Sequence, residues 1–213
     1  MISRRCLEVF AHCRQPLSIV TKIRLILRDL DLLRDLAAHD AVGVALSLTS
    51  LDAGLSARME PRAAAPADRL ETIRRLKAAG VPVGVLLAPV IPSLNDVQIP
   101  ALLAAAADAG ARWAGYVLLR LPHQVKDLFG DWLRRNFPQR AAHVESQIRQ
   151  THGGQLYDAR FGVRQLGEGP LAQHIGDIFR VCAARSGLAG EASAPSGASF
   201  RRPCGGQMNL FFD

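Results

Sequence analysis

The fold is decided by residues 47–96, whose sequence is SLTSLDAGLSARMEPRAAAPADRLETIRRLKAAGVPVGVLLAPVIPSLND. In order, the stretch predicts the end of a strand, a polar loop, a helix, a second strand and a second polar loop. We expect the helix to begin at Pro66, with acidic residues in its first turn, and to end at Gly80. Short apolar runs at 42–46 and 81–87 predict the two strands. A strand, a helix and a strand in this order form a βαβ unit, in which both strands run in the same direction.

The same alternation continues on both sides of this unit. Before it we expect a helix over 3–13, a strand over 17–21 and a helix over 29–38. After it we expect a helix ending at 110, a strand over 114–121 and a helix from 125. The pattern predicts an α/β fold with about four parallel strands. Ligands of such folds bind at the carboxyl ends of the strands, so functional residues are expected at 21–22, 47–50, 88–95 and 120–123.

Length and composition predict one globular body. The chain has 213 residues, of which 49% are hydrophobic, and this is enough to bury a sizeable core. No apolar run approaches the roughly 18 residues of a membrane-spanning helix, so we expect a cytoplasmic protein without a membrane partner. The net charge is +7 and is carried almost entirely by arginine. This charge is compatible with nucleic-acid binding, but arginine richness also follows from GC-rich coding.

The cysteines do not form a metal-binding pattern. The chain has four of them, without any CxxC pair: Cys6, Cys13, Cys182 and Cys204. Scattered cysteines of this kind predict small buried thiols in a reducing compartment rather than a zinc or iron–sulfur framework.

Several strings of the chain resemble one known family. In chain order they are SIVTK, RDLDLL, SLTSLD, MEPRA, RLETIRRLKAAGVPVGVLLAPVIPSLND and AGYVLLRLP. They are similar, over residues 4–188, to the radical SAM proteins known as DNA repair photolyases, which are relatives of spore photoproduct lyase. The resemblance implies that residues 1–188 form an incomplete (βα)6 partial barrel, equivalent to its third to sixth strands with C-terminal helices. It also implies S-adenosylmethionine and a [4Fe-4S] cluster as the cofactors of the complete family.

The cluster motif of that family is missing here. The family binds its cluster through a CxxxCxxC loop after the first strand, and the sequence contains no such motif. We therefore expect no cluster to assemble on this chain, whose first two barrel strands are also missing by this count. Three explanations stay open: the true start lies upstream of Met1, the gene is a decayed copy, or another chain supplies the front half. In the chain as given, residues 17–21 would form an exposed apolar strand edge, which predicts association and poor solubility.

The resemblance also implies a binding site for S-adenosylmethionine. Lys22 matches a position that approaches the carboxylate of this cofactor, Ser47 or Thr49 matches the ribose contact, and Ala88 matches a backbone contact to adenine. Where the family has a serine after the TK pair, this chain has Ile23. Ordinary structural roles stay open for each residue: a solvated lysine, a hydroxyl that caps a turn and an alanine that packs in the core.

Two further groups are candidates from the residues alone. Arg120 ends an apolar strand and is expected to point toward the mouth of the barrel, where it would bind a ligand. Glu60, Arg62 and Arg69 lie in or after the polar loop, and they either bind an anion or form an ion pair within the loop. Tyr116 and Cys182 are considered as residues that quench a product radical, but nothing in the sequence distinguishes them from core residues. No catalytic residue is assigned.

The C-terminal part differs in composition from the body. Residues 189–206 are rich in glycine, alanine, serine and proline, which predicts a flexible, disordered linker. Residues 207–213 follow as a short docking motif. Its residues Gln207, Met208, Leu210 and Phe211 are similar to the pentapeptide that binds the bacterial sliding clamp. Two alternatives stay open for this apolar cluster: it binds the clamp, or it folds back onto the body.

Two functions therefore stand. In the first, the chain is the C-terminal part of a radical SAM enzyme that acts on nucleic acid, with DNA as the expected partner. In the second, the chain is a truncated, non-catalytic barrel that binds partners through its C-terminal motif.

Overall fold

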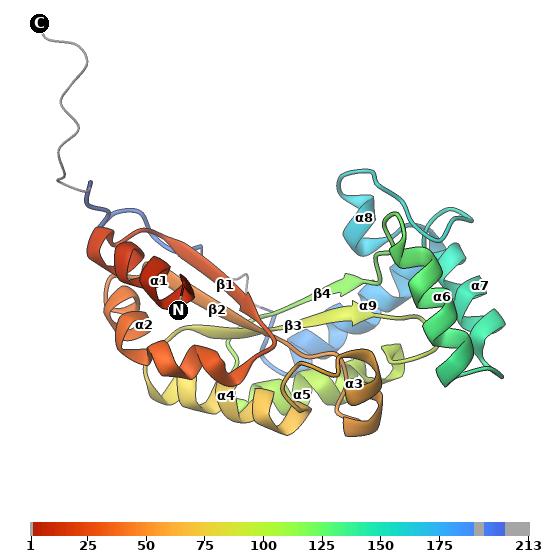
Figure 1. Ribbon diagram of the computed structural model, residues 1–213, viewed down its shortest axis with the longest axis horizontal. Helices are drawn as coiled ribbons and strands as arrows, with labels where there is room; N and C mark the ends of the chain where they lie inside the picture. The colour runs from red at the N-terminus through yellow and green to blue at the C-terminus, as the bar shows by residue number, and fades with distance from the viewer. Residues whose placement is uncertain (1, 190–193, 203–213) are drawn as a thin grey trace, which may run out of the picture.

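The computed structural model describes residues 2–189 and 194–202. Four parallel strands form one sheet in the order β1-β2-β3-β4 (Figure 1). They are β1 (Leu17–Thr21), β2 (Val42–Ser47), β3 (Val83–Val90) and β4 (Ala114–Leu118). Helical segments alternate with the strands, so the expected α/β fold with four parallel strands is confirmed.

The helical segments close to the sheet follow the chain in a regular order. They are α1 (Ile2–Cys13), η1 (Arg24–Asp29), α2 (Leu30–Ala37), α3 (Ala53–Met59), α4 (Pro66–Ala78), η2 (Asp96–Gln98) and α5 (Ile99–Ala109). Helix α4 begins at the expected proline, and α5 ends at Gly110, which has a left-handed backbone with φ of 101°. The last helices are α6 (Val125–Asn136), α7 (Ala141–Gln150), α8 (Val163–Leu166) and α9 (Gly169–Arg185).

Helix α3 differs from the sequence-based expectation, which placed a polar loop between β2 and α4. The side chain of Asp52 caps this helix by accepting hydrogen bonds from the backbone N–H groups of Gly54 and Leu55, at 2.7 and 3.1 Å. A side-chain cap satisfies N–H groups that the first turn leaves without partners. Leu55 is buried and anchors the helix. The cap and this anchor explain why a glycine- and serine-containing segment forms a helix.

Helices cover one face of the sheet. Along β2 and β3 the side chains of alternate residues point to this face, where Val44, Leu46, Val83, Val85 and Leu87 are almost fully buried. Around β1 and β2, residues of α1, α2 and α4 form one hydrophobic cluster. Around β3 and β4, residues of α5 and α9 form a second cluster. Figure 1 shows α4 and α5 running along this side of the strands.

The other face of the sheet carries small side chains along β2. Gly43, Ala45 and Ser47 of β2 lie on it, and register places Gly84 of β3 beside Ala45. The indole ring of Trp113 lies across this face, 3.8 Å from the position that a Cβ atom at Gly43 would take. The space above the amino half of β2 and β3 is therefore filled by one aromatic ring.

Strand β1 is an edge of the sheet in the part of the chain that the structure describes. Val20, next to Ala45 in register, keeps 61% of its surface exposed, and Leu25 after the strand keeps 63%. This agrees with the expected exposed apolar edge, while poor solubility stays a prediction. None of the described helices combines the length and the apolar character that a membrane-spanning helix needs.

Residues 194–202 lie at the amino ends of the strands. The backbone N–H of Ser196 donates to the carbonyl oxygen of Asp40 at 2.7 Å, and that of Arg201 donates to the carbonyl oxygen of Cys13 at 2.8 Å. Asp40 precedes β2, and Cys13 ends α1. The flexibility predicted for residues 189–206 stays a prediction. The docking motif at 207–213 lies outside the described residues.

Close packing of Trp113 on Gly84 makes a matched pair of variants informative. A Cβ atom at Gly84 would lie 2.3 Å from the indole ring, whereas one at Gly43 would keep an ordinary contact distance of 3.8 Å. We expect Gly84→Ala to displace the ring and to lower the free energy of unfolding by about 1–3 kcal/mol. Gly43→Ala should leave stability nearly unchanged. Urea denaturation followed by tryptophan fluorescence measures both, and equal stability of the two variants would contradict this packing.

Candidate functional site

Polar residues gather at the carboxyl ends of β1, β2 and β3. Lys22 follows β1, Ser47 ends β2, Thr49 comes two residues later, and Ala88 lies near the end of β3. Parallel strands end at the same edge of a sheet, and the structure brings these four residues into one hydrogen-bonded network. Glu60, which follows α3, is at its centre.

The carboxylate of Glu60 has three partners. Lys22 pairs with Oε1, while the guanidinium of Arg69 donates to Oε2 at 2.7 Å and the hydroxyl of Thr49 donates to Oε2 at 3.1 Å. The side chains of Glu60 and Arg69 are only 10% and 1% exposed, whereas that of Lys22 is 39% exposed. Burial works to raise the pKa of Glu60, but hydrogen bonds and charge attraction from Lys22 and Arg69 outweigh it and lower this pKa below its usual value.

Arg69 connects three segments of the chain. Besides the ion pair with Glu60, its Nη1 donates to the carbonyl oxygen of Ser47 at 2.9 Å, and its Nε donates to the carbonyl oxygen of Ala64 at 2.8 Å. The planar guanidinium has donors in fixed directions, which suits it to such a junction. Of the two alternatives left open by the sequence, the structure contains the ion pair, which joins Glu60 of the loop to Arg69 of α4. Arg69 thus positions the loop that carries Glu60.

Ser47 and Thr49 act together on the backbone of β3. Both hydroxyls donate to the carbonyl oxygen of Ala88, at 3.0 and 3.1 Å, and both side chains are buried. The peptide bond between Ala88 and Pro89 is cis. The single hydroxyl proton of Thr49 is shared between this carbonyl and the carboxylate of Glu60. The carbonyl of Ala88 is therefore held in place from the neighbouring strand.

Asn95 is a positioning residue that the sequence analysis did not identify as such. Its side chain is buried; Nδ2 donates to the carbonyl oxygens of Thr49 at 2.8 Å and Pro89 at 3.0 Å, and Oδ1 accepts from the backbone N–H of Ile91 at 2.7 Å. One amide thus joins the loops after β2 and β3. Asn95 falls within the range 88–95 where functional residues were expected, but its role was not predictable, since its partner Thr49 lies 46 residues away.

Arg120 lies two residues after β4. It is not part of the hydrogen-bonded network that joins Lys22, Ser47, Thr49 and Ala88. Its Nε is buried and, within the described structure, makes no hydrogen bond. A buried guanidinium nitrogen without a partner is a costly arrangement that a ligand or a water molecule relieves. The position at the strand end agrees with the expectation for Arg120, and its role in binding a ligand stays a prediction.

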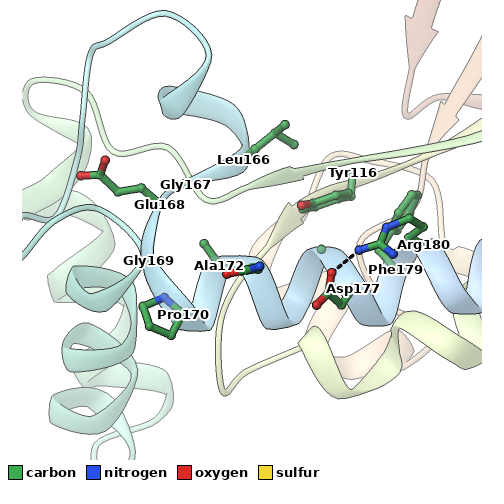
Figure 2. Close-up of a pocket in the computed structure, with 12 residues that line it drawn as sticks. Tyr116, Leu166, Gly167, Glu168, Gly169, Pro170, Ala172, Asp177, Phe179 and Arg180 are labelled. Atoms are coloured by element: carbon green, nitrogen blue, oxygen red, sulfur yellow. Dashed lines mark hydrogen bonds and ion pairs between the residues drawn. The ribbon is translucent and has the colours of Figure 1, made fainter.

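A cavity of about 670 Å³ lies away from this network, between α8 and α9 (Figure 2). Tyr116 of β4 lines it beside the ion pair of Asp177 and Arg180, and its ring lies 4.7 Å from that of Phe179. Burial, together with the negative charge of Asp177, raises the pKa of the Tyr116 hydroxyl. Tyr116 is paired in register with Leu87, so it lies on the helix-covered face of the sheet. This places it in a different environment from Ala88 and Glu60.

The described cysteines do not form a metal site. Cys6 is exposed on α1, Cys13 is buried at its end, and Cys182 is partly buried on α9. Across residues 2–189 and 194–202, no group of three or more histidine, cysteine, aspartate or glutamate side chains is placed to hold a metal ion. The donor set of the described residues therefore does not fit a [4Fe-4S] cluster, which needs several thiolates.

Comparison with known proteins supports the fold and leaves the activity open. No family model matches the chain. Uncharacterized proteins of Mycobacterium tuberculosis and Mycobacterium bovis are 35% identical to it over 137 residues, which make up 63% of this chain and 40% of each relative. An uncharacterized protein of Acidianus two-tailed virus is 37% identical over 90 residues, or 42% of this chain and 29% of the relative.

Two solved structures share the arrangement of elements. They are mutants of spore photoproduct lyase, one with cysteine replaced by serine and one with tyrosine replaced by phenylalanine. Each superposes with a TM-score of 0.62 at 17% identity, over 88% of this chain and 53% of the lyase. The expected likeness to a spore photoproduct lyase-type barrel is thus confirmed for the fold. The chain spans about half of the lyase and 40% of the mycobacterial relatives.

The buried position of Glu60 predicts a pH-dependent contribution to stability. At pH 7, Glu60→Gln removes the negative partner of Lys22 and Arg69, and we expect a loss of about 2–3 kcal/mol in the free energy of unfolding. Because the pKa of Glu60 is lowered in the folded state, its stabilising effect is complete above the usual value of 4.5 and is lost as the pH falls further. The stability difference between the wild-type protein and the variant should shrink below that pH.

The matched control is Glu71→Gln. Glu71 pairs with Arg74, but both side chains are about half exposed, at 52% and 53%. Exposed pairs contribute less than about 1 kcal/mol, so this variant should unfold almost like the wild-type protein. Chemical denaturation between pH 3 and pH 8 measures all three proteins. Equal losses for both variants at pH 7 would show that Glu60 has no special role.

Proposed function

We propose that this chain is the C-terminal part of a radical SAM enzyme related to the DNA repair photolyases, and that its strand-end network contributes to an S-adenosylmethionine site. The observation that supports this is the joining of Lys22, Ser47, Thr49 and Ala88 around Glu60. These residues lie at the carboxyl ends of parallel strands, where folds of this class bind ligands. The activity of the whole protein and its substrate belong to the same proposal.

The network suits the carboxylate group of S-adenosylmethionine. Lys22 has a partly exposed ammonium group with three donors, one of which is used by Glu60. A second anion, such as the carboxylate of the cofactor, finds two free N–H donors there. Charge-assisted hydrogen bonds of this type are stronger than neutral ones. Lys22 is therefore the residue that we propose for the carboxylate.

The remaining residues position backbone atoms. Since Ser47 and Thr49 are buried and both donate to the carbonyl oxygen of Ala88, their effect in the structure is to fix that peptide. In this proposal the backbone of Ala88 contacts adenine, and the two hydrogen bonds to its carbonyl oxygen hold that backbone in position. A ribose contact by either hydroxyl, and a ligand contact by Arg120, are part of the proposal and not of the observed network.

The family's chemistry is the reductive cleavage of S-adenosylmethionine to a 5'-deoxyadenosyl radical at the cluster. The described residues do not provide the thiolates for the cluster, so no reaction step is assigned to them. What these residues supply is binding and orientation: an ammonium group for a carboxylate, and a backbone carbonyl held by two hydroxyls. The excess of positive charge on the chain is compatible with DNA as the partner of the complete enzyme.

Binding of S-adenosylmethionine to the full chain tests this proposal. We expect the wild-type chain to bind it in isothermal titration calorimetry, and Lys22→Gln to weaken binding by about 10–100-fold, because a charge-assisted hydrogen bond is lost. Lys126→Gln is the control, since Lys126 is exposed on α6. Failure of the folded wild-type chain to bind, or equal affinity of the two variants, would contradict the proposed site.

The second function, a non-catalytic barrel that binds partners, is favoured by the absence of a CxxxCxxC motif from the sequence. The residues proposed for a sliding-clamp contact, Gln207, Met208, Leu210 and Phe211, lie outside the described structure. Their role in binding the clamp stays a proposal that rests on the sequence.

Anaerobic reconstitution with iron and sulfide distinguishes the two functions for this polypeptide. We expect iron to be lost on desalting, because the described cysteines, two on α1 and one on α9, do not belong to any group placed to hold a metal ion. Absorption spectra and iron content measure the result, with a Cys6→Ser, Cys182→Ser variant as the control for adventitious binding. A stable cluster with thiolate-to-iron absorption, present only in the wild-type chain, would favour an active enzyme instead.

A further inference from the structure

One face of α1 is apolar and exposed. Ile2 and Val9 keep 82% and 59% of their surface exposed, and Cys6 between them is an exposed thiol. Together with Arg5 and Phe10 they line a groove of about 400 Å³. Residues at these spacings share one side of a helix. An apolar groove of this kind is a typical docking surface for an apolar segment.

The opposite face of α1 packs against the body of the protein. Leu7 and Ala11 are buried in the hydrophobic cluster that also contains Leu33 and Leu36 of α2. The groove is therefore not a consequence of a loosely attached helix, because α1 is fixed to the body by its other side. A segment that fills the groove must come from elsewhere in the chain or from another molecule.

The last described residues lie beside this helix. The backbone N–H of Arg201 donates to the carbonyl oxygen of Cys13, the last residue of α1, at 2.8 Å. In Figure 1 the described chain ends next to the red helix α1. The last described residues thus lie at the Cys13 end of the helix that carries the groove.

The length and composition of residues 203–213 fit the groove. They contain Met208, Leu210, Phe211 and Phe212, followed by Asp213. Leu210 is eight residues beyond Arg202, and eight extended residues span at most about 29 Å. Helix α1 is only about 17 Å long from Cys13 back to Ile2, at ~1.5 Å per residue. A segment of this length is therefore long enough to span the groove without any change in the body, and Asp213 carries a charge opposite to that of Arg5.

We propose that residues 207–212 dock into the α1 groove of the same chain, running from the Cys13 end toward the Ile2 end. Docking removes a cluster of large apolar side chains from water, and burial of such side chains is the main favourable contribution to association. It also covers Ile2 and Val9. The inference is independent of S-adenosylmethionine binding, because α1 and the strand-end network share no residue.

Disulfide trapping in the full chain tests the docking. Cys6 is the native thiol in the groove, and Leu210→Cys introduces a second thiol in a background with Cys182→Ser and Cys204→Ser. With oxidised glutathione, we expect a disulfide between Cys6 and the introduced cysteine within one chain. Peptide mass mapping identifies the bond, and its rate of formation is the quantity compared.

Three further variants separate docking from random collision of a tethered segment. Val9→Asp places a charge in the groove, and Phe211→Ser with Phe212→Ser removes the apolar anchors; each change should slow trapping at least tenfold. Leu128→Asp is the matched control on α6, where Leu128 is 68% exposed, and it should have no effect. Val9 and Leu128 are both exposed, so neither variant should unfold the body, which thermal melting verifies.

Three results would overturn the proposal. The first is trapping at the same rate in Val9→Asp as in Leu128→Asp. The second is a disulfide that links two chains, which would assign the groove to a second copy. The third is the absence of trapping in every variant, which would leave the segment free for a partner such as the sliding clamp.

Discussion

The ion pair of Glu60 and Arg69 is the interaction on which the carboxyl end of the sheet depends. Arg69 belongs to α4, Glu60 to the loop after α3, and the carbonyl that Arg69 also contacts to the end of β2. A charge of this kind is expensive to bury unless its donors are satisfied, and the three contacts of Arg69 provide this. Because the loop is closed by the pair, Glu60 is presented to Lys22 and Thr49. The site is therefore a product of a folded loop and not of the strands alone.

Much of the fold follows from local sequence signals, because apolar runs, prolines and glycines mark strands and helix ends directly. The location of Lys22, Ser47, Thr49 and Ala88 at strand ends was predictable for the same reason. The roles of Glu60 and Asn95 were not, since both act through partners far away in the sequence, such as Lys22 and Thr49 at separations of 38 and 46 residues. Helix α3 was missed because one capping side chain, Asp52, decides it.

The similarity of this protein to spore photoproduct lyase concerns the fold, and a shared fold does not imply a shared chemistry. The superposition on spore photoproduct lyase mutants at 17% identity establishes how the strands and helices are arranged. Chemistry depends on donor atoms at particular places. The network around Glu60 consists of charged groups and hydroxyls at the strand ends, whereas the described cysteines lie on α1 and α9. The shared fold therefore describes the scaffold of this chain, while its chemistry depends on the side chains that the scaffold carries.

The two hydrogen bonds that attach residues 194–202 to Asp40 and Cys13 have a directional consequence. They hold the described end of the chain at the amino ends of the strands, while Lys22, Ser47 and Ala88 lie at the carboxyl ends. The length of the sheet therefore separates the segment 194–202 from the hydrogen-bonded network around Glu60, and the strands are the elements that connect these two ends of the molecule.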